Sequence, residues 1–357
     1  MKTVILGDLH FGVKGFGDKF FSNQLKFFDE QLFPYMIKNK IDTIIQLGDW
    51  MENRKNMDIK FLNRITDEFC QRLVDHNIKF ITFLGNHDIY YNSKLDINLV
   101  KYFARLYPDN ITVLDKITKM QFGKSTYCFM PWIIDSKVTI NQIDDVDVLF
   151  GHFEIKNFEM VKGHVDQDST LTSSFFQKAK RLKKVISGHY HVQSTDGFVI
   201  FAGTPYQLNW GDYDTPRGFF VIDEENMEFI ENRVSQKFVK IKYDDTLEHA
   251  IEIKGLTEDP IHLDTIEPAI EDLKPHTVKY FVNKAEDKKY ENDLYHLHQA
   301  EIKYGLTNNV EISNLIGTDF KDTVVENISV TELILKTIKD GAPQLLEKAQ
   351  KLLANIT

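Results

Sequence analysis

Five short apolar runs in the first half of the chain end in the same way, with a glycine that a polar residue follows at once. They are residues 4–6 before Gly7-Asp8, 44–47 before Gly48-Asp49, 80–84 before Gly85-Asn86, 146–150 before Gly151-His152 and 185–187 before Gly188-His189. Runs that are apolar throughout are typical of strands buried on both faces of a sheet. Between them, residues 21–38 and 59–75 carry apolar side chains at helical spacing, which predicts amphipathic helices. Strands that alternate with helices predict an α/β fold with a layered sheet.

The polar residues behind these strands predict a metal centre, because ligands of layered α/β sheets bind outside the carboxyl ends of the strands. The candidates are Asp8, His10, Asp49, Asn86, His87, Asp88, His152, His189 and His191. Their carboxylate, imidazole and amide groups suit manganese, iron or zinc better than calcium or magnesium. The set is too large for one tetrahedral ion and fits two ions that share a ligand. Two ions about 3.5–4 Å apart can clamp both oxygens of an in-line phosphoryl displacement.

Taken singly, each fragment is weak, because a Gly-Asp pair is most often a turn and a lone histidine is most often structural. Together and in this order, they resemble the motif series of the calcineurin-like metallophosphoesterases. Within that superfamily the chain resembles the SbcD-type nucleases, called meiotic recombination eleven in eukaryotes, and among these the phage recombination endonuclease subunits. Further stretches fit that branch: Pro131-Trp132, Gly203-Thr204-Pro205, Gly211-Asp212 and residues 216–219. The resemblance is specific over residues 1–222.

The resemblance implies a β-sandwich flanked by helices and a centre with two divalent ions. Manganese is expected first, with magnesium, iron or zinc as alternatives. One ion would be held by Asp8, His10, Asp49 and His191, and the second by Asp49, Asn86, His152 and His189, so that Asp49 bridges them. By the same resemblance, His87 stabilises charge at the scissile phosphate and helps to protonate the leaving oxygen. Asp88 would orient His87.

One loop departs from the commonest pattern of that family. After Gly48-Asp49, family members usually continue with an aromatic or aliphatic pair and an aspartate, and some place a histidine nearby. This chain has Trp50-Met51-Glu52 and no histidine in the loop. Glu52 can replace the aspartate in charge, so the departure is expected to affect the exonuclease geometry and not the metal centre.

Charge divides the chain into a balanced front and an acidic back. Residues 1–220 carry 27 Lys and Arg against 26 Asp and Glu, whereas residues 221–357 carry 16 against 27. This shift predicts a domain boundary near residues 220–240. The resemblance then implies three parts: a metallophosphoesterase nuclease domain at 1–232, a small α+β capping domain that positions DNA at 233–325, and a C-terminal helical segment at 326–357. The excess of acidic residues in the back part argues against a broad DNA-binding face there.

Partner contacts are predicted at several places. In the last segment, Ser329 and Glu332 form a capping box that opens a helix, and a second helix follows Gly341-Ala342-Pro343. These helices either pack on their own domain or, as the resemblance implies, bind an SbcC-type ATPase. The resemblance also implies a homodimer, for which residues 59–75 and 95–107 (Leu95, Leu99, Phe103, Leu106) are the candidates. Arg54 and Lys55 are stronger candidates for DNA contact than the basic cluster at 178–184, which equally fits a solvated helix end.

The sequence thus predicts a manganese-dependent DNA exonuclease and endonuclease that acts in end processing, recombination and double-strand-break repair. Its DNA substrates would be duplex ends and single strands. The alternative is a metallophosphoesterase that acts on a small phosphodiester or a phosphoprotein. No apolar run approaches the roughly 20 residues of a membrane helix. Two cysteines and a strand-like N-terminus indicate a reducing cytoplasm, which is that of the host if the chain is of phage origin.

Overall fold

The computed structural model describes residues 2–308 except 92–93, 133–137, 225, 286–288 and 303. Residues 1–309 form one compact unit and residues 310–357 a second. The C-terminal helices predicted for 326–357, with their capping box at Ser329 and Glu332, lie outside the described residues. So do residues 309–325 of the predicted capping domain.

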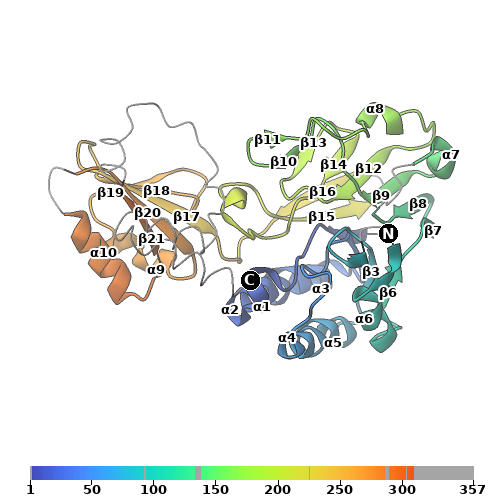
Figure 1. The fold of residues 1–357 in the computed structure, drawn as a ribbon, viewed down its shortest axis with the longest axis horizontal. Helices are drawn as coiled ribbons and strands as arrows, with labels where there is room; N and C mark the ends of the chain where they lie inside the picture. Colours follow the sequence, from blue (N-terminus) through green and yellow to red (C-terminus); the bar gives the residue numbers. More distant parts are fainter. Residues whose placement is uncertain are drawn as a thin grey trace, which may run out of the picture. The chain divides into compact units, whose positions relative to one another are not determined.

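The first sheet has six strands in the order β16-β15-β1-β2-β3-β6 (Figure 1). The bounds are β1 Lys2–Leu6, β2 Thr43–Gln46, β3 Lys79–Phe83, β6 Ile111–Leu114, β15 Gly218–Asp223 and β16 Asn226–Glu231. β1, β2, β3 and β6 run parallel, while β15 pairs antiparallel with β1 and with β16. The carboxyl ends of the parallel strands therefore meet at one edge.

The second sheet also has six strands, in the order β13-β14-β12-β9-β8-β7. The bounds are β7 Thr118–Phe122, β8 Ser125–Met130, β9 Val148–His152, β12 Lys184–Gly188, β13 Ser194–Thr195 and β14 Val199–Phe201. Its four middle strands are parallel. Two small hairpins stand beside the sheets: β4 (Ile89–Tyr91) with β5 (Lys94–Asn98), and β10 (Glu159–Val161) with β11 (His164–Val165).

The two six-stranded sheets pack face to face because their strands are apolar on both sides. Ile5 and Ile45 of the first sheet pack with Phe150 and Ile186 of the second in a core between the sheets. The intervening residues, such as Val4 in β1, face outward into a different core. This alternation of side chains buries β1, β2, β3, β9 and β12 on both faces, as the sequence predicts.

Helices cover both outer faces of the sandwich. The first sheet is covered by α2 (Asp18–Phe27), α3 (Phe33–Asn39), α4 (Ile59–Arg64), α5 (Gln71–Asp75) and α6 (Val100–Leu106). The wider turns η1 (Phe28–Leu32) and η2 (Ile65–Cys70) make α2–α3 and α4–α5 continuous, in agreement with the helices predicted at 21–38 and 59–75. The second sheet is covered by α7 (Ile140–Ile143) and α8 (Ser173–Phe176). The short turns α1 (Val13–Phe16) and η3 (Trp210–Asp212) complete this part.

A third, five-stranded sheet follows in the order β19-β18-β17-β20-β21. Its strands are β17 Phe238–Asp244, β18 Ile251–Lys254, β19 Ile261–Leu263, β20 Thr277–Lys284 and β21 Tyr304–Asn308. The helices η4 (Glu267–Ala269), α9 (Ile270–Leu273) and α10 (Tyr290–Gln299) belong to the same α+β part. Within the described residues, no helix has the length and apolar character to cross a membrane.

Candidate metal centre

The predicted ligands meet at the carboxyl edge of the sandwich, and the glycines before them make that approach possible. A Cβ atom on Gly48 would lie 2.7 Å from Nδ1 of His152 and 2.8 Å from the backbone nitrogen of Gly85. A Cβ atom on Gly188 would lie 2.5 Å from Oδ1 of Asp8. Real Cβ atoms do not come so close to other heavy atoms, so these loops pack together only without a side chain.

The ligand loops also hold an uncommon backbone conformation. His10, Asp49 and His189 have φ values of 47°, 52° and 90°, in the left-handed region that non-glycine residues avoid. Such strain costs on the order of 1–3 kcal/mol per residue and persists where the surroundings impose it, most often at functional sites. Here the three strained residues follow β1, β2 and β12, and their side chains belong to the two ligand groups described next.

The first ligand group consists of Asp8, His10 and His191. The Nε2 atoms of His10 and His191 lie 3.0 Å apart. Oδ2 of Asp8 lies 3.9 Å from Nε2 of His10 and 4.0 Å from Nε2 of His191. Asp8 and His10 are buried, and the Asp8 carboxylate accepts hydrogen bonds from the backbone of His189.

The second ligand group consists of Asp49, His152 and His189, and Asn86 joins it. Oδ2 of Asp49 lies 3.3 Å from Nε2 of His152. Oδ1 of Asn86 lies 3.0 Å from both Nε2 of His152 and Nδ1 of His189. Asp49 also reaches the first group, with Oδ2 at 3.9 Å from Nε2 of His10. Its carboxylate therefore lies between the two groups.

Three of the inward-facing imidazoles, those of His10, His152 and His189, have an acceptor behind the outer nitrogen. Nδ1 of His10 lies 2.7 Å from Oε2 of Glu52, and Nδ1 of His152 lies 2.8 Å from the carbonyl oxygen of Leu47. Nε2 of His189 lies 3.3 Å from Oε1 of Glu154. An acceptor at the outer nitrogen fixes the tautomer and leaves the inner nitrogen free to bind a metal, as in most metal-ligating histidines.

The pKa values of these groups reflect burial and their mutual charges. Burial raises the pKa of Asp8 to about 7. Burial opposes protonation of His152, but the charges of Asp49 and Asp8 outweigh it and raise its pKa to about 9. For His10, Glu52 adds to the same charges and raises the pKa to about 9. Burial lowers the pKa of His189, whose ring is therefore neutral.

The structure gives Asp88 a role that differs from the predicted one. Its buried carboxylate accepts hydrogen bonds from the backbone N–H groups of Asp49, Met51 and Gly85, at 2.8, 3.0 and 2.9 Å. His87 instead has Nδ1 at 3.0 Å from the carbonyl oxygen of Glu52. Asp88 therefore ties the Asp49 loop to the Gly85 loop, and the Glu52 loop orients His87. The physical reason is that buried backbone donors at these loop ends need an acceptor.

The donor set fits two divalent ions. In each group the ligand atoms of Asp and His side chains lie within 4.8 Å of one another, an arrangement that a divalent cation would stabilise. The Asn86 amide illustrates this, because its oxygen faces the ring nitrogens of His152 and His189. Turned over, its nitrogen would donate to both rings and its oxygen would accept from Arg54 at 3.2 Å. With its oxygen toward the two rings, Asn86 can bind a metal ion. With its nitrogen toward them, it satisfies hydrogen bonds in the absence of a metal ion.

All seven predicted ligands thus lie within two adjoining groups, with His87 beside them. Sequence patterns missed Glu154 and gave no role to the contact of Trp132, whose ring centroid lies 5.2 Å from that of His189. Glu154 lies two residues after His152, where spacing alone could have flagged it. The contact of Glu52 with both His10 and His87 was not predicted either, although its charge was noted.

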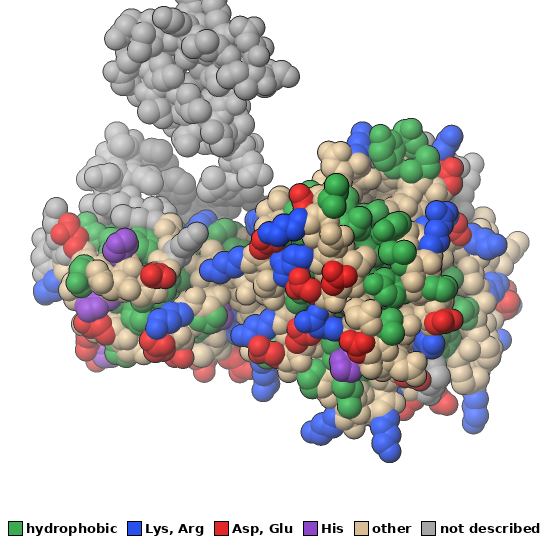
Figure 2. Space-filling view, turned by 90° about the horizontal axis from the view of Figure 1, so that it is seen from below, with side chains coloured by type: hydrophobic (Ala, Val, Ile, Leu, Met, Phe, Trp, Pro, Cys, Tyr) green, Lys and Arg blue, Asp and Glu red, His purple; other side chains and the backbone are tan. Residues whose placement is uncertain are grey.

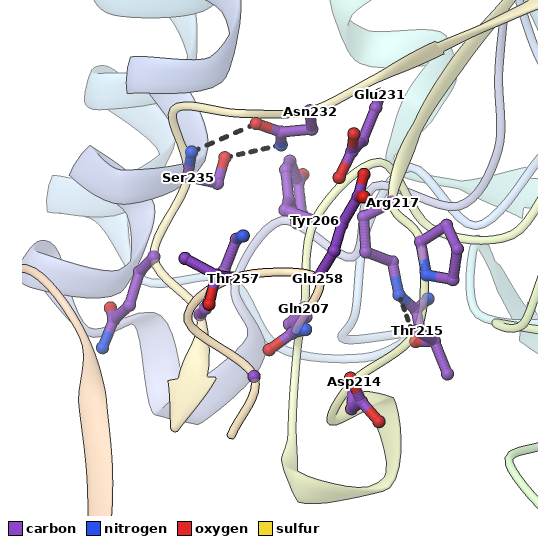
Figure 3. Close-up of a pocket in the computed structure, with 14 residues that line it drawn as sticks. Tyr206, Gln207, Asp214, Thr215, Arg217, Glu231, Asn232, Ser235, Thr257 and Glu258 are labelled. Atoms are coloured by element: carbon purple, nitrogen blue, oxygen red, sulfur yellow. Dashed lines mark hydrogen bonds between the residues drawn. The ribbon is translucent and has the colours of Figure 1, made fainter. Parts of the chain in front are cut away.

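A separate cavity of about 280 Å³ lies beside the passage from β16 to β17, with Tyr206, Arg217 and Asn232 in its wall (Figure 3). None of the nine candidate metal-centre residues lines it. It is nevertheless linked to the centre, because Nη1 of Arg217 donates to the carbonyl oxygen of His191. Nη2 of the same side chain donates to Asp212 at 3.0 Å. This buried guanidinium holds the His191 loop from behind.

Comparison with known proteins gives the following matches. Residues 1–193 match the family of calcineurin-like phosphoesterases. The chain is 33% identical over 241 residues to exonuclease subunit 1 of enterobacteria phage T4, across 66% of this chain and 69% of that protein. It is 22% identical over 259 residues to a protein of invertebrate iridescent virus 3 that carries a phosphoesterase name, across 68% and 69%. Among solved structures, the inner-membrane-complex anchor GAP50 of Plasmodium aligns with 13% identity and a TM-score of 0.35, across 86% of this chain and 96% of that one.

Proposed function

The chain belongs to the calcineurin-like phosphoesterase family, and from that premise we propose that it is a two-metal, manganese-dependent DNA nuclease. The observation that carries the proposal is the pair of ligand groups with Asp49 between them and His87 at their side. The proposed activity is exonuclease and endonuclease cleavage in end processing, recombination and double-strand-break repair. DNA is the favoured substrate because the phage T4 relative is named as an exonuclease subunit.

The residues divide the work of phosphodiester hydrolysis. Asp8, His10 and His191 would hold one ion, and Asn86, His152 and His189 the other, with Asp49 shared. When bound, two such ions neutralise charge on the phosphate and lower the pKa of water. His87 keeps Nδ1 on the Glu52 carbonyl oxygen, which leaves Nε2 as the nitrogen that contacts the leaving oxygen. Its backbone N–H donates to Oδ1 of Asp49 at 2.7 Å, so the position of His87 is tied to that of the shared ligand.

A homodimer is proposed through the helical face that covers the first sheet. Ile59 on α4 is 76% exposed and Leu106 on α6 is 48% exposed, and Tyr102 between them in sequence is exposed too. Helices α4 and α5 lie at the bottom of Figure 1 and so face the viewer in Figure 2, where apolar side chains are exposed between charged ones. Phe103, predicted for the same contact, is buried in the chain's own core.

An ATPase partner and a location in the host cytoplasm belong to the same proposal. The T4 relative is named as a subunit, which supports a partner protein. We assign the SbcC-type ATPase to the segment 326–357, which lies outside the described residues. The capping role of residues 233–325 in positioning DNA is likewise part of this proposal.

Hydrolysis of an end-labelled linear DNA duplex and of a single strand with Mn²⁺ tests the proposal. We expect His87→Ala to slow cleavage by at least about 100-fold and to leave Mn²⁺ binding unchanged, since His87 is not one of the seven proposed ligands. Asp49→Ala should abolish both. The exposed His164, on β11, provides a matched histidine control, and His164→Ala should cleave normally.

Two results would contradict the proposal. Full cleavage by Asp49→Ala would exclude the metal centre as the site of hydrolysis. Hydrolysis of a small phosphodiester, with no cleavage of DNA even after an SbcC-type ATPase is added, would favour the second candidate function, a phosphoesterase for small phosphodiesters or phosphoproteins.

A further inference from the structure

The hairpin β4–β5 begins directly after His87-Asp88 and exposes two tyrosines. Ile89 is 1% exposed and anchors the hairpin in the core beneath the helices. Tyr90 and Tyr91, the next two residues, are 36% and 49% exposed. Their hydroxyl groups make no hydrogen bond to any residue that the structure describes. Among the described residues, no hydrogen bond therefore accounts for two large aromatic side chains at this place.

An irregularity in the strand brings the two rings together. Successive side chains of a regular strand point to opposite faces. Here the register between β4 and β5 shifts between Ile89 and Tyr91. As a result, the ring centroids of Tyr90 and Tyr91 lie only 4.6 Å apart with an interplanar angle of 73°. Such bulges occur next to active sites, where they redirect a side chain.

The loop of residues 52–55 joins this tyrosine pair to the metal centre. The carbonyl oxygen of Glu52 holds His87, and Nη2 of Arg54 lies 3.2 Å from the Asn86 amide. The Lys55 ammonium lies 5.6 Å from the centroid of the Tyr90 ring. Arg54 thus contacts a candidate metal ligand, and its neighbour Lys55 contacts the tyrosine pair.

We propose that Tyr90 and Tyr91 form a stacking platform for an unpaired nucleobase of the strand whose phosphodiester lies at the metal centre. The inference rests on the proposed nuclease function and adds its substrate preference. Aromatic rings beside cations are what single-stranded nucleic acid binds, because every base has a face to stack and every link has a phosphate to pair. A base inside an intact duplex offers no free face. The platform therefore favours single strands and frayed ends over blunt duplex ends.

Paired substitutions distinguish the contribution of the aromatic rings from that of the hydroxyl groups. Tyr90→Ala with Tyr91→Ala removes both rings, whereas Tyr90→Phe with Tyr91→Phe keeps them. Tyr295→Ala is the matched control, since Tyr295 on α10 is also an exposed tyrosine. The substrates are a single-stranded oligonucleotide, a blunt duplex that contains the same strand, and bis(4-nitrophenyl) phosphate, each with Mn²⁺. Anisotropy of the labelled oligonucleotide without metal measures binding independently of hydrolysis.

We expect the alanine pair to raise KM and the dissociation constant for the single strand about 10-fold. Its kcat, and its hydrolysis of the small phosphodiester, should stay at the wild-type level. The phenylalanine pair and Tyr295→Ala should behave as wild type, and the blunt duplex should be affected less than the single strand.

Three outcomes would overturn the platform. Unchanged single-strand binding by the alanine pair would show that the rings contact no base. An equal loss on the small phosphodiester would show that the hairpin supports the metal centre instead. If wild type sediments as a dimer and the alanine pair as a monomer, the rings form a subunit contact. If wild type itself hydrolyses only the small phosphodiester, the nuclease proposal fails, which is a distinct result.

Discussion

At the residue scale, we expect the carboxylates behind the histidines to set the metal affinity of the proposed centre. Glu52 and Glu154 both approach the outer nitrogen of an inward-facing imidazole, at 2.7 and 3.3 Å, but Glu154 is the more exposed of the two. A solvated carboxylate interacts more weakly with the imidazole beside it, because water screens its charge.

Glu52→Gln should therefore weaken Mn²⁺ binding about 10- to 100-fold, and Glu154→Gln should weaken it much less. Isothermal titration calorimetry on the two variants measures the difference. Equal affinities in both variants would mean that the short contact to His10 does not tune the centre.

Protonation of the buried imidazoles predicts a pH dependence for metal binding. His10 and His152 have pKa values raised to about 9, so both rings are protonated in the metal-free protein at pH 7.5. A metal binds only the neutral ring, and binding must then release protons. Apparent Mn²⁺ affinity should rise as pH increases from 7 toward 9. Calorimetry in buffers of different ionisation enthalpy would detect the released protons. Identical heats of binding in all buffers would contradict the raised pKa values of His10 and His152.

At the scale of single elements, the sequence shows a glycine before five of the seven candidate ligands but does not show why a glycine is needed there. The sequence shows Gly48 before Asp49, and only the structure shows that a Cβ atom there would meet His152 and Gly85. The strands, the two long helices and the convergence of all seven candidate ligands could be predicted because local apolar patterns and adjacent motifs define them. Glu154, the role of Asp88 and the paired rings of Tyr90 and Tyr91 could not, because they depend on loop geometry and on a register shift.

Gly48→Ala tests whether close packing at the ligand loops matters. Gly48 has a φ of 92° and no room for a methyl group, whereas Gly123 has a φ of 61° and no atom within 4 Å of the place that a Cβ atom would take. Both substitutions strain the backbone, but only the first adds a clash. Gly48→Ala should lower the free energy of unfolding about 1–3 kcal/mol more than Gly123→Ala does, and it should also weaken Mn²⁺ binding. Urea denaturation of both variants gives the comparison, and equal losses would exclude the clash.

At the scale of the whole described molecule, one asparagine fastens the chain where it passes from β16 to β17. Oδ1 of Asn232 accepts from the backbone of Val234 and Ser235, at 3.0 and 3.1 Å, and Nδ2 donates to the carbonyl oxygen of Pro205 and to Oγ of Ser235. The predicted domain boundary at 232/233 falls on this residue. It stays a prediction, since residues 1–309 form one compact unit.

Asn232→Ala should lower the free energy of unfolding by about 1–3 kcal/mol, because it leaves buried groups without partners. Hydrogen exchange of β17 and proteolysis of residues 233–237 should accelerate, while Mn²⁺ binding should not change. Exchange rates that match the wild type in β17 would show that the third sheet is held by its other contacts. Those contacts include the backbone N–H of Phe238, which donates to Oε1 of Gln207 at 2.6 Å.

The three bonds from Asp88 to the backbone of the Asp49 and Gly85 loops have a consequence for metal selectivity. They link the strained ligand loops through the chain's own groups, and such links should limit how far the proposed metal ligands can move apart. A ligand set that is held in this way should not expand to bind a larger ion. Ca²⁺, whose oxygen ligands lie at about 2.3–2.6 Å in flexible geometry, should therefore be rejected by size as well as by donor type. Asp88→Asn should make the ligand loops more mobile. Its first effect should be a smaller difference between the affinities for Mn²⁺ and Ca²⁺, with the number of ions bound unchanged.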